Sequence, residues 1–231
     1  MLFSLLEGEN IRDVLIELLL MIPIILFSLS FHEAAHALIA YKLGDPTARN
    51  LGRLTLNPVK HLDPFGALSM LLIGIGWAKP VPINVRNFEN PRKGMMLSAL
   101  AGPVSNLILA IGFAFLTATY ELLLFVWKIE ITLLPLIIYQ LLYLGVYLNA
   151  ALAIFNLIPA PPFDGSRIFF YFLPKNWYFR VMQYERYIGL GIMLVLIVLS
   201  RLGFSPVGFL AGGLTDLLLW PFQRLAVLII S

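Results

Sequence analysis

The stretch LSFHEAAHALIAYKLG, residues 29–44, places two histidines and a glutamate in a largely apolar run. The rest of the chain is similarly apolar: 60% of its 231 residues are hydrophobic and 13% are charged, whereas soluble domains have about 25% charged residues. Uncharged runs at 95–120 and 131–163 are longer than the ~20 residues that cross a bilayer. The sequence therefore predicts an all-α polytopic membrane protein with about four to six transmembrane helices.

The apolar stretches divide the chain into segments of spanning length. We expect transmembrane helices at about 14–41, 95–120, 131–155 and 187–200. The last stretch, 202–231, contains two prolines and two charged residues and is either a fifth span or an interfacial helix. Because the chain shows neither an internal repeat nor a hydrophilic domain, residues 1–231 are expected to form one membrane-embedded domain.

Basic residues flank the short apolar segment FGALSMLLIGIGWA, residues 65–78. Eight of the 16 lysines and arginines lie in the two segments 42–60 and 79–93, which the positive-inside rule places in the cytoplasm. The apolar segment is too short to span as a helix, and both its flanks favour the same side. We therefore expect a re-entrant hairpin or loop with bends at Gly74 and Gly76. A short interfacial helix is the alternative.

The histidines and glutamate of the first stretch fit the pattern H-E-x-x-H. Residues i and i+4 share one face of a helix, so the imidazoles of His32 and His36 can reach one zinc ion. Glu33 would then act as general base for a water molecule. The chain has no cysteine, so any metal must be held by nitrogen and oxygen ligands. A metal-free proton relay or a structural polar pair is the alternative, because ionisable residues inside a membrane are costly and usually functional.

A catalytic zinc site needs a third protein ligand. The extended motif with a third histidine is absent, since Ile39 and Lys42 stand at its glycine and histidine positions. Asp164 is the best candidate because its predicted depth matches that of His32 and because prolines and a glycine fix the backbone around it. The alternative is an ordinary turn aspartate. His61 lies in a basic cytoplasmic segment, where we expect a loop role rather than metal ligation.

Three motifs together resemble those of the site-2 proteases, zinc metalloproteases that cut substrates within the membrane. They are HEAAH at 32–36, GPVSN at 102–106 and NLIPAPPFDG at 156–165. The stretch GWAKPVPIN at 76–84 is also similar to the family. The resemblance covers roughly residues 25–170. With no stretch that would hold a PDZ or CBS domain, the chain resembles the small, compact prokaryotic branch of the family.

The resemblance implies roles for individual residues. It implies one zinc ion per chain, bound by His32, His36 and Asp164, with Glu33 as the catalytic base. It further implies that Asn156 helps to stabilise the oxyanion. On the second span, Ser98, Gly102 and Ser105 or Asn106 recur at helical spacing and form a face of small side chains, which we expect to serve mainly in helix packing. The alternative is that Asn106 forms a hydrogen bond near the site.

The expected function is therefore that of an intramembrane zinc endopeptidase. Its expected partners are transmembrane protein substrates and the lipid bilayer, not nucleic acid, and it is expected as a multi-pass protein of the cell membrane with its active site toward the cytoplasm. A metal-ion or proton-coupled transporter is the alternative, because it would also explain ionisable residues in spans and a broken helix. A third possibility is a binding protein without catalytic activity.

Overall fold

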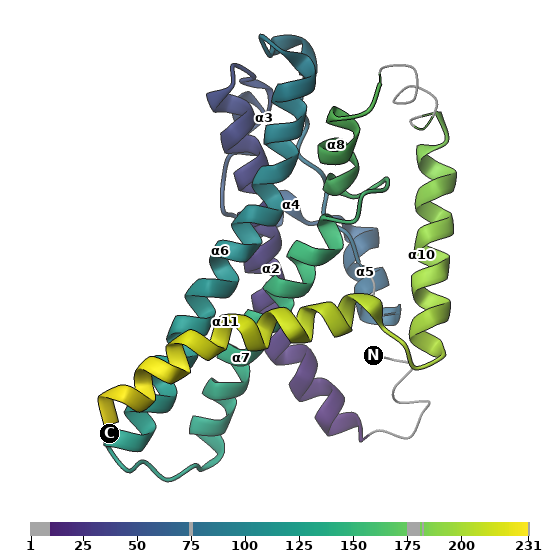
Figure 1. The fold of residues 1–231 in the computed structure, drawn as a ribbon. Coiled ribbons are helices and arrows are strands. Elements are labelled where there is room, and N and C mark those ends of the chain that lie inside the picture. The colour runs from purple at the N-terminus through teal and green to yellow at the C-terminus, as the bar shows by residue number, and fades with distance from the viewer. Residues whose placement is uncertain (1–9, 74–75, 175–180, 182, 231) are drawn as a thin grey trace.

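The computed structural model describes residues 10–73, 76–174, 181 and 183–230, which are mostly helical (Figure 1). The long helices are α2 (Ile11–Lys42), α6 (Pro91–Val126), α7 (Leu133–Asn156), α10 (Glu185–Arg201) and α11 (Pro206–Ile230). The short ones are α3 (Thr47–Asn50), α4 (Pro58–His61), α5 (Pro64–Ile73), the 3₁₀ helix η1 (Val85–Asn87) and α8 (Asp164–Tyr171). No strand occurs among the described residues, so the all-α prediction is confirmed.

Three helices in the described part of the chain are long and apolar enough to cross a membrane. They are α2 from Leu18 onward, α6 and α7. Helices α10 and α11 pass the same test together, although they are bent by 75° at the break between them. The prediction of a polytopic membrane protein is confirmed. When the bent pair is counted as one span, the number of spans is at the lower end of the expected range.

The bundle is centred on α6, which packs against both α2 and α7. The packed face of α6 carries small residues, among them Ala110 and Ala114, which are fully buried. On α7, Gly145 lies so close to the Phe113 ring that a Cβ atom would come within 2.5 Å of it. Close van der Waals packing of small residues holds membrane helices together, because lipid tails are as apolar as the side chains they would replace.

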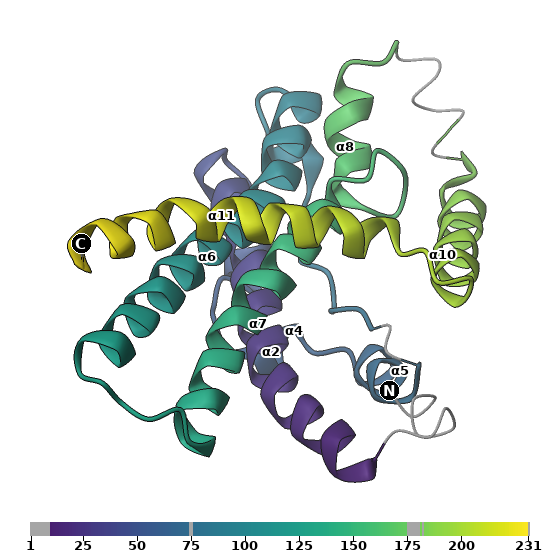
Figure 2. The same ribbon diagram turned by 60° about the horizontal axis from the view of Figure 1, so that its bottom comes forward.

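Helix α11 lies across α6 and α7 in both views (Figures 1 and 2). Its packed side carries Ala211, Thr215 and Leu219, which are spaced four residues apart and are all buried. The opposite side is exposed, for example at Phe209. The C-terminal stretch is therefore a helix laid against the bundle at a sharp angle to α10.

The residues that flank the segment 65–78 lie next to each other, so the chain returns to the point from which the segment starts. Leu62 and Ala78 form an isolated antiparallel bridge, and the Lys79 N–H donates to the His61 carbonyl at 2.8 Å. The outward arm is helix α5. Of the two expected bends, Gly76 lies in the extended return and Gly74 lies outside the described residues. The out-and-back course matches the re-entrant prediction, while the helical arm matches the alternative.

Helix α8 was not predicted, because its eight residues follow a proline-rich loop and carry no long apolar run. Its C-terminal end is held by Arg92 of α6, whose guanidinium donates to the carbonyls of Phe170, Tyr171 and Leu173 at 2.6–3.2 Å. Its first residue is Asp164. The helix thus fixes the position of that carboxylate relative to α6 and, through α6, relative to α2.

Candidate metal centre

Three predicted ligand residues converge at the junction of α2 and α8. The Nε2 atoms of His32 and His36 each lie 3.2 Å from Oδ2 of Asp164, and they are 2.9 Å from each other. Both histidines are buried and the aspartate is half-buried. Among the described residues, this is the group of histidine and acidic side chains whose spacing could hold a metal ion.

The outer nitrogen of each imidazole is engaged elsewhere. Nδ1 of His36 meets the Ser98 carbonyl at 2.6 Å, and a carbonyl oxygen only accepts, so this Nδ1 carries the proton. Nδ1 of His32 meets Oδ1 of Asn106, which is likewise an acceptor. Both Nε2 atoms are therefore left with lone pairs that point at each other and at a carboxylate oxygen.

Such a cluster of acceptors needs a cation at its centre or protons on Nε2. If the imidazoles were protonated, they would form ion pairs with the carboxylate of Asp164. Burial works to raise the pKa of Asp164, but the charge on His36 and the hydrogen bonds from both rings hold this pKa well below its usual range. A zinc ion meets the same need, because tetrahedral ligands at about 2.0–2.1 Å from zinc are about 3.3 Å apart. Two imidazoles and one carboxylate also form a ligand set of the catalytic type, which keeps one position open. The residues therefore fit zinc.

Glu33 is buried beside these ligands, and in the described part of the chain one backbone group donates to its carboxylate. The Val81 N–H donates to Oε2 of Glu33 at 2.9 Å. Val81 lies between Pro80 and Pro82, neither of which has an N–H. In this stretch of three residues, the backbone therefore has one donor, and that donor is directed at Glu33.

Two buried charged residues fix the segment that carries Val81. The Arg53 guanidinium donates to the carbonyls of Lys79 and Pro80. Asp45, which is fully buried, accepts hydrogen bonds from the Asn84 N–H and the Asn87 amide, each at 2.7 Å, and also from Thr47. Burial works to raise the pKa of Asp45, but these hydrogen bonds lower it below its usual value. From the sequence alone, Asp45 is interpreted as an acid in an ordinary hydrated loop, and its burial corrects that interpretation.

The GPVSN motif on α6 lies directly against both imidazoles. A Cβ atom on Gly102 would come within 2.5 Å of Cε1 and Nε2 of His36, and it would also overlap the His32 ring. Asn106, four residues further on, accepts from His32 and donates to Oδ1 of Asn149 at 3.1 Å. The motif therefore supports the ligands as well as packing two helices together.

Asn149 is a site residue that the sequence analysis missed. It is fully buried on α7, and its amide donates to the Gly145 carbonyl at 2.8 Å, which orients its oxygen toward Asn106. The available signal was an amide side chain inside an apolar span, where polar groups are rare and usually paired.

The structure does not bring two other predicted residues into the ligand group. The side-chain amide of Asn156 donates to the Leu152 carbonyl of its own helix at 3.0 Å. His61 ends helix α4, is 2% exposed, and approaches the Thr55 carbonyl through Nε2 at 2.9 Å. His61 is not among the three residues of the metal cluster found in the described part of the chain.

Comparisons with known proteins agree with the motifs. The sequence model described as "Peptidase family M50" matches residues 129–200. The chain is 42% identical over 198 residues to "Putative zinc metalloprotease YwhC" of Bacillus subtilis, a match that covers 85% of this chain and 82% of that protein. It is 30% identical over 149 residues to "Putative zinc metalloprotease Rip2" of Mycolicibacterium smegmatis, covering 61% of this chain and 52% of that protein. No solved structure matches. With this identity over most of both chains, the protein belongs to peptidase family M50, the site-2 proteases.

Proposed function

We propose that this chain is an intramembrane zinc endopeptidase that hydrolyses peptide bonds in or near the transmembrane segments of membrane proteins. The observation that carries the proposal is the convergence of two imidazole Nε2 atoms and one carboxylate oxygen within 3.2 Å of one another. Glu33, the residue next to His32, supplies the base that hydrolysis needs. Such an enzyme would serve regulated intramembrane proteolysis.

The ligands of the zinc ion would be His32, His36 and Asp164. A zinc ion held there would activate water as a nucleophile near neutral pH and polarise the scissile carbonyl. Glu33 takes the proton from the attacking water and passes it to the leaving amine. The hydrogen bond from Val81 keeps the carboxylate in one orientation while it does so.

Asn156 would donate its side-chain amide to the oxyanion that forms at the scissile carbonyl. Its amide donates to the Leu152 carbonyl, so that this role requires a change of its side-chain rotamer when substrate is present. Helix α7 ends at Asn156, and a side chain at a helix end has room for such a rotation.

The substrates would be membrane segments that unwind near the cleavage point. A helix engages its carbonyls in i to i−4 hydrogen bonds, and these must open before a carbonyl can be attacked. Residues that weaken a helix, such as glycine, proline and asparagine, should therefore favour cleavage. In the sequence-based topology, the basic segments 42–60 and 79–93 lie at the same end of the bundle as the ligands, so the site would face the cytoplasm of a multi-pass protein.

The test combines zinc content with cleavage of a model transmembrane substrate by purified protein in lipid nanodiscs. Wild type should bind about one zinc per chain and cleave, whereas Glu33→Gln should keep zinc and lose at least about 100-fold in kcat, because a general base contributes 10²–10⁴-fold. Asp164→Ala should lose zinc. Undiminished cleavage by Glu33→Gln would overturn the proposal. Transport of metal ions or protons into proteoliposomes without cleavage would favour the transporter instead.

A further inference from the structure

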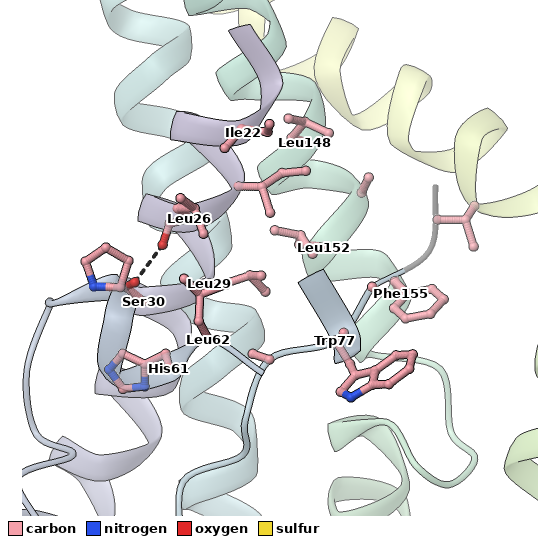
Figure 3. Close-up of a pocket in the computed structure, with 17 residues that line it drawn as sticks. Ile22, Leu26, Leu29, Ser30, His61, Leu62, Trp77, Leu148, Leu152 and Phe155 are labelled. Atoms are coloured by element: carbon pink, nitrogen blue, oxygen red, sulfur yellow. Dashed lines mark hydrogen bonds between the residues drawn. The ribbon is translucent and has the colours of Figure 1, made fainter. Parts of the chain in front are cut away.

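An apolar cavity of about 400 Å³ lies between α2, α7 and the return of the α5 segment (Figure 3). This volume is within the range of about 300–1,000 Å³ that is usual for ligand pockets. Its walls are mainly aliphatic and aromatic, as in Ile22, Leu26, Leu29, Leu148, Leu152 and Trp77. A site with such walls would bind apolar groups.

Three segments that line the cavity carry residues of the proposed catalytic site a short distance further along the chain. On α2, Leu29 lines the cavity, and His32 lies three residues further along on the same helix face. On α7, Leu152 lines it, and Asn156 lies four residues further along on the same helix face. In the return segment, Ala78 lines it, three residues before the valine whose N–H donates to Glu33. An extended chain bound in the cavity would therefore lead into the site where water is activated.

His61, which lines the cavity, has a buried ring nitrogen without a hydrogen-bond partner among the described residues. Ser30 uses its hydroxyl to donate to the Leu26 carbonyl at 2.6 Å. His61, by contrast, is 2% exposed and donates through Nε2 to the Thr55 carbonyl, so Nδ1 of the neutral ring is an acceptor. This Nδ1 has no hydrogen-bond partner among the described residues. Buried polar atoms are nearly always paired, and an orphan calls for a ligand or a water.

We propose that this cavity binds the apolar side chains next to the scissile bond of the substrate, and that Nδ1 of His61 accepts a backbone N–H of the same unwound segment. The inference rests on the proposed proteolytic function and adds to it a substrate preference. An unwound peptide supplies both groups that the cavity needs, apolar side chains and a free N–H. A lipid acyl chain supplies only the first, and it is therefore not the occupant that we propose.

The first test reduces the volume of the cavity. Leu152→Trp should raise KM at least about tenfold for a substrate with leucine at the contacted positions, and should shift the preference toward alanine, because overpacking a filled site excludes the larger side chain. Zinc content should stay at the wild-type level. Leu134→Trp is the matched control, since Leu134 lies on the same helix, does not line the cavity and is 66% exposed. This control should leave KM unchanged for both substrates.

The second test removes the acceptor while keeping the bond to Thr55. In His61→Gln, the side-chain amide takes the place of Nε2, and nothing takes the place of Nδ1. KM should rise about threefold to tenfold, the usual effect of one neutral hydrogen bond, while kcat stays within about twofold of wild type. A substrate with an ester in place of the contacted N–H should be cleaved equally by wild type and His61→Gln. A purely structural role of His61 would not depend on that ester.

Binding is measured separately in the Glu33→Gln background, with a photoreactive benzoylphenylalanine at position 152 or, as a control, at position 134. Substrate should crosslink at 152 and not at 134. If wild type cleaves substrate but neither crosslinking nor KM responds to the cavity changes, the cavity proposal fails and the protease stands. If crosslinking at 152 occurs but wild type does not cleave, the proposed function fails and the binding site stands. Crosslinking of 152 to lipid alone overturns the cavity proposal.

Discussion

Replacing Gly102 with alanine should remove zinc binding through one added methyl group. The new Cβ would lie 2.5 Å from Cε1 and Nε2 of His36, whereas ordinary van der Waals contact begins near 3.4 Å. The ring or the helix must therefore move by about 1 Å. Metal sites accept ligand distances only within about 0.2 Å, and changes in the groups that orient ligands typically cost 10–100-fold in affinity. We expect zinc affinity to fall by at least about 100-fold.

The same helix provides the control for this experiment. A Cβ on Gly112 would meet nothing within 4 Å, so Gly112→Ala should keep zinc affinity and activity. Both substitutions favour the helix by up to about 1 kcal/mol, so a loss seen only in Gly102→Ala cannot come from helix propensity. Zinc affinity is measured by competition with a chromophoric chelator, and cleavage is measured in parallel. Zinc affinity of Gly102→Ala within about threefold of wild type would refute the proposed contact between α6 and the imidazoles.

Three further predictions concern the groups around the ligands. Asn149→Leu should weaken zinc binding about threefold to tenfold in the same chelator competition, less than the 10–100-fold that is typical when a ligand's direct partner is lost, because Asn149 reaches His32 only through Asn106; unchanged affinity would contradict the chain from Asn149 to His32. Val81→Pro should keep zinc but lower kcat about 10–100-fold, because a hydrogen bond to a charged group contributes about 1.5–3 kcal/mol; an unchanged kcat would show that Glu33 does not need this bond. Asp45 has a lowered pKa in the fold, so its contribution to stability is present above the usual value of about 3.9 and is lost as the pH falls below it. Asp45→Asn should therefore unfold at a lower temperature at pH 7, with a difference from wild type that shrinks toward pH 3; a constant difference would contradict this.

The sequence predicted those parts of the fold and the site that depend on short-range spacing. Apolar runs of spanning length predicted α2, α6 and α7, because crossing a bilayer requires a fixed length of helix. The H-E-x-x-H spacing predicted two imidazoles on one face of α2. Asp164 was predicted from its depth and its rigid neighbours, and the structure brings its carboxylate to the two imidazoles. Zinc binding by these three residues stays a prediction.

The parts that were missed depend on contacts between distant segments. Helix α8 contains only eight residues and is held at its end by Arg92, about 80 positions earlier in the chain. The bond from Val81 to Glu33 joins residues 48 positions apart. The pairing of Asn106 with Asn149 joins two spans. No local pattern specifies such partners, because each bond is possible only after the helices have packed.

The prolines near the site reduce the number of backbone groups that need a hydrogen-bond partner. Irregular backbone within a membrane protein exposes N–H and C=O groups that need partners, and each unpaired group is costly. The two irregular segments beside the ligands, 76–84 and 157–163, are rich in proline, which removes an N–H at each such position and stiffens the chain. The donor that remains between Pro80 and Pro82 is directed at Glu33, and the second segment ends at Asp164. Prolines thus let the backbone depart from a helix beside the metal ligands while leaving few polar groups to be satisfied.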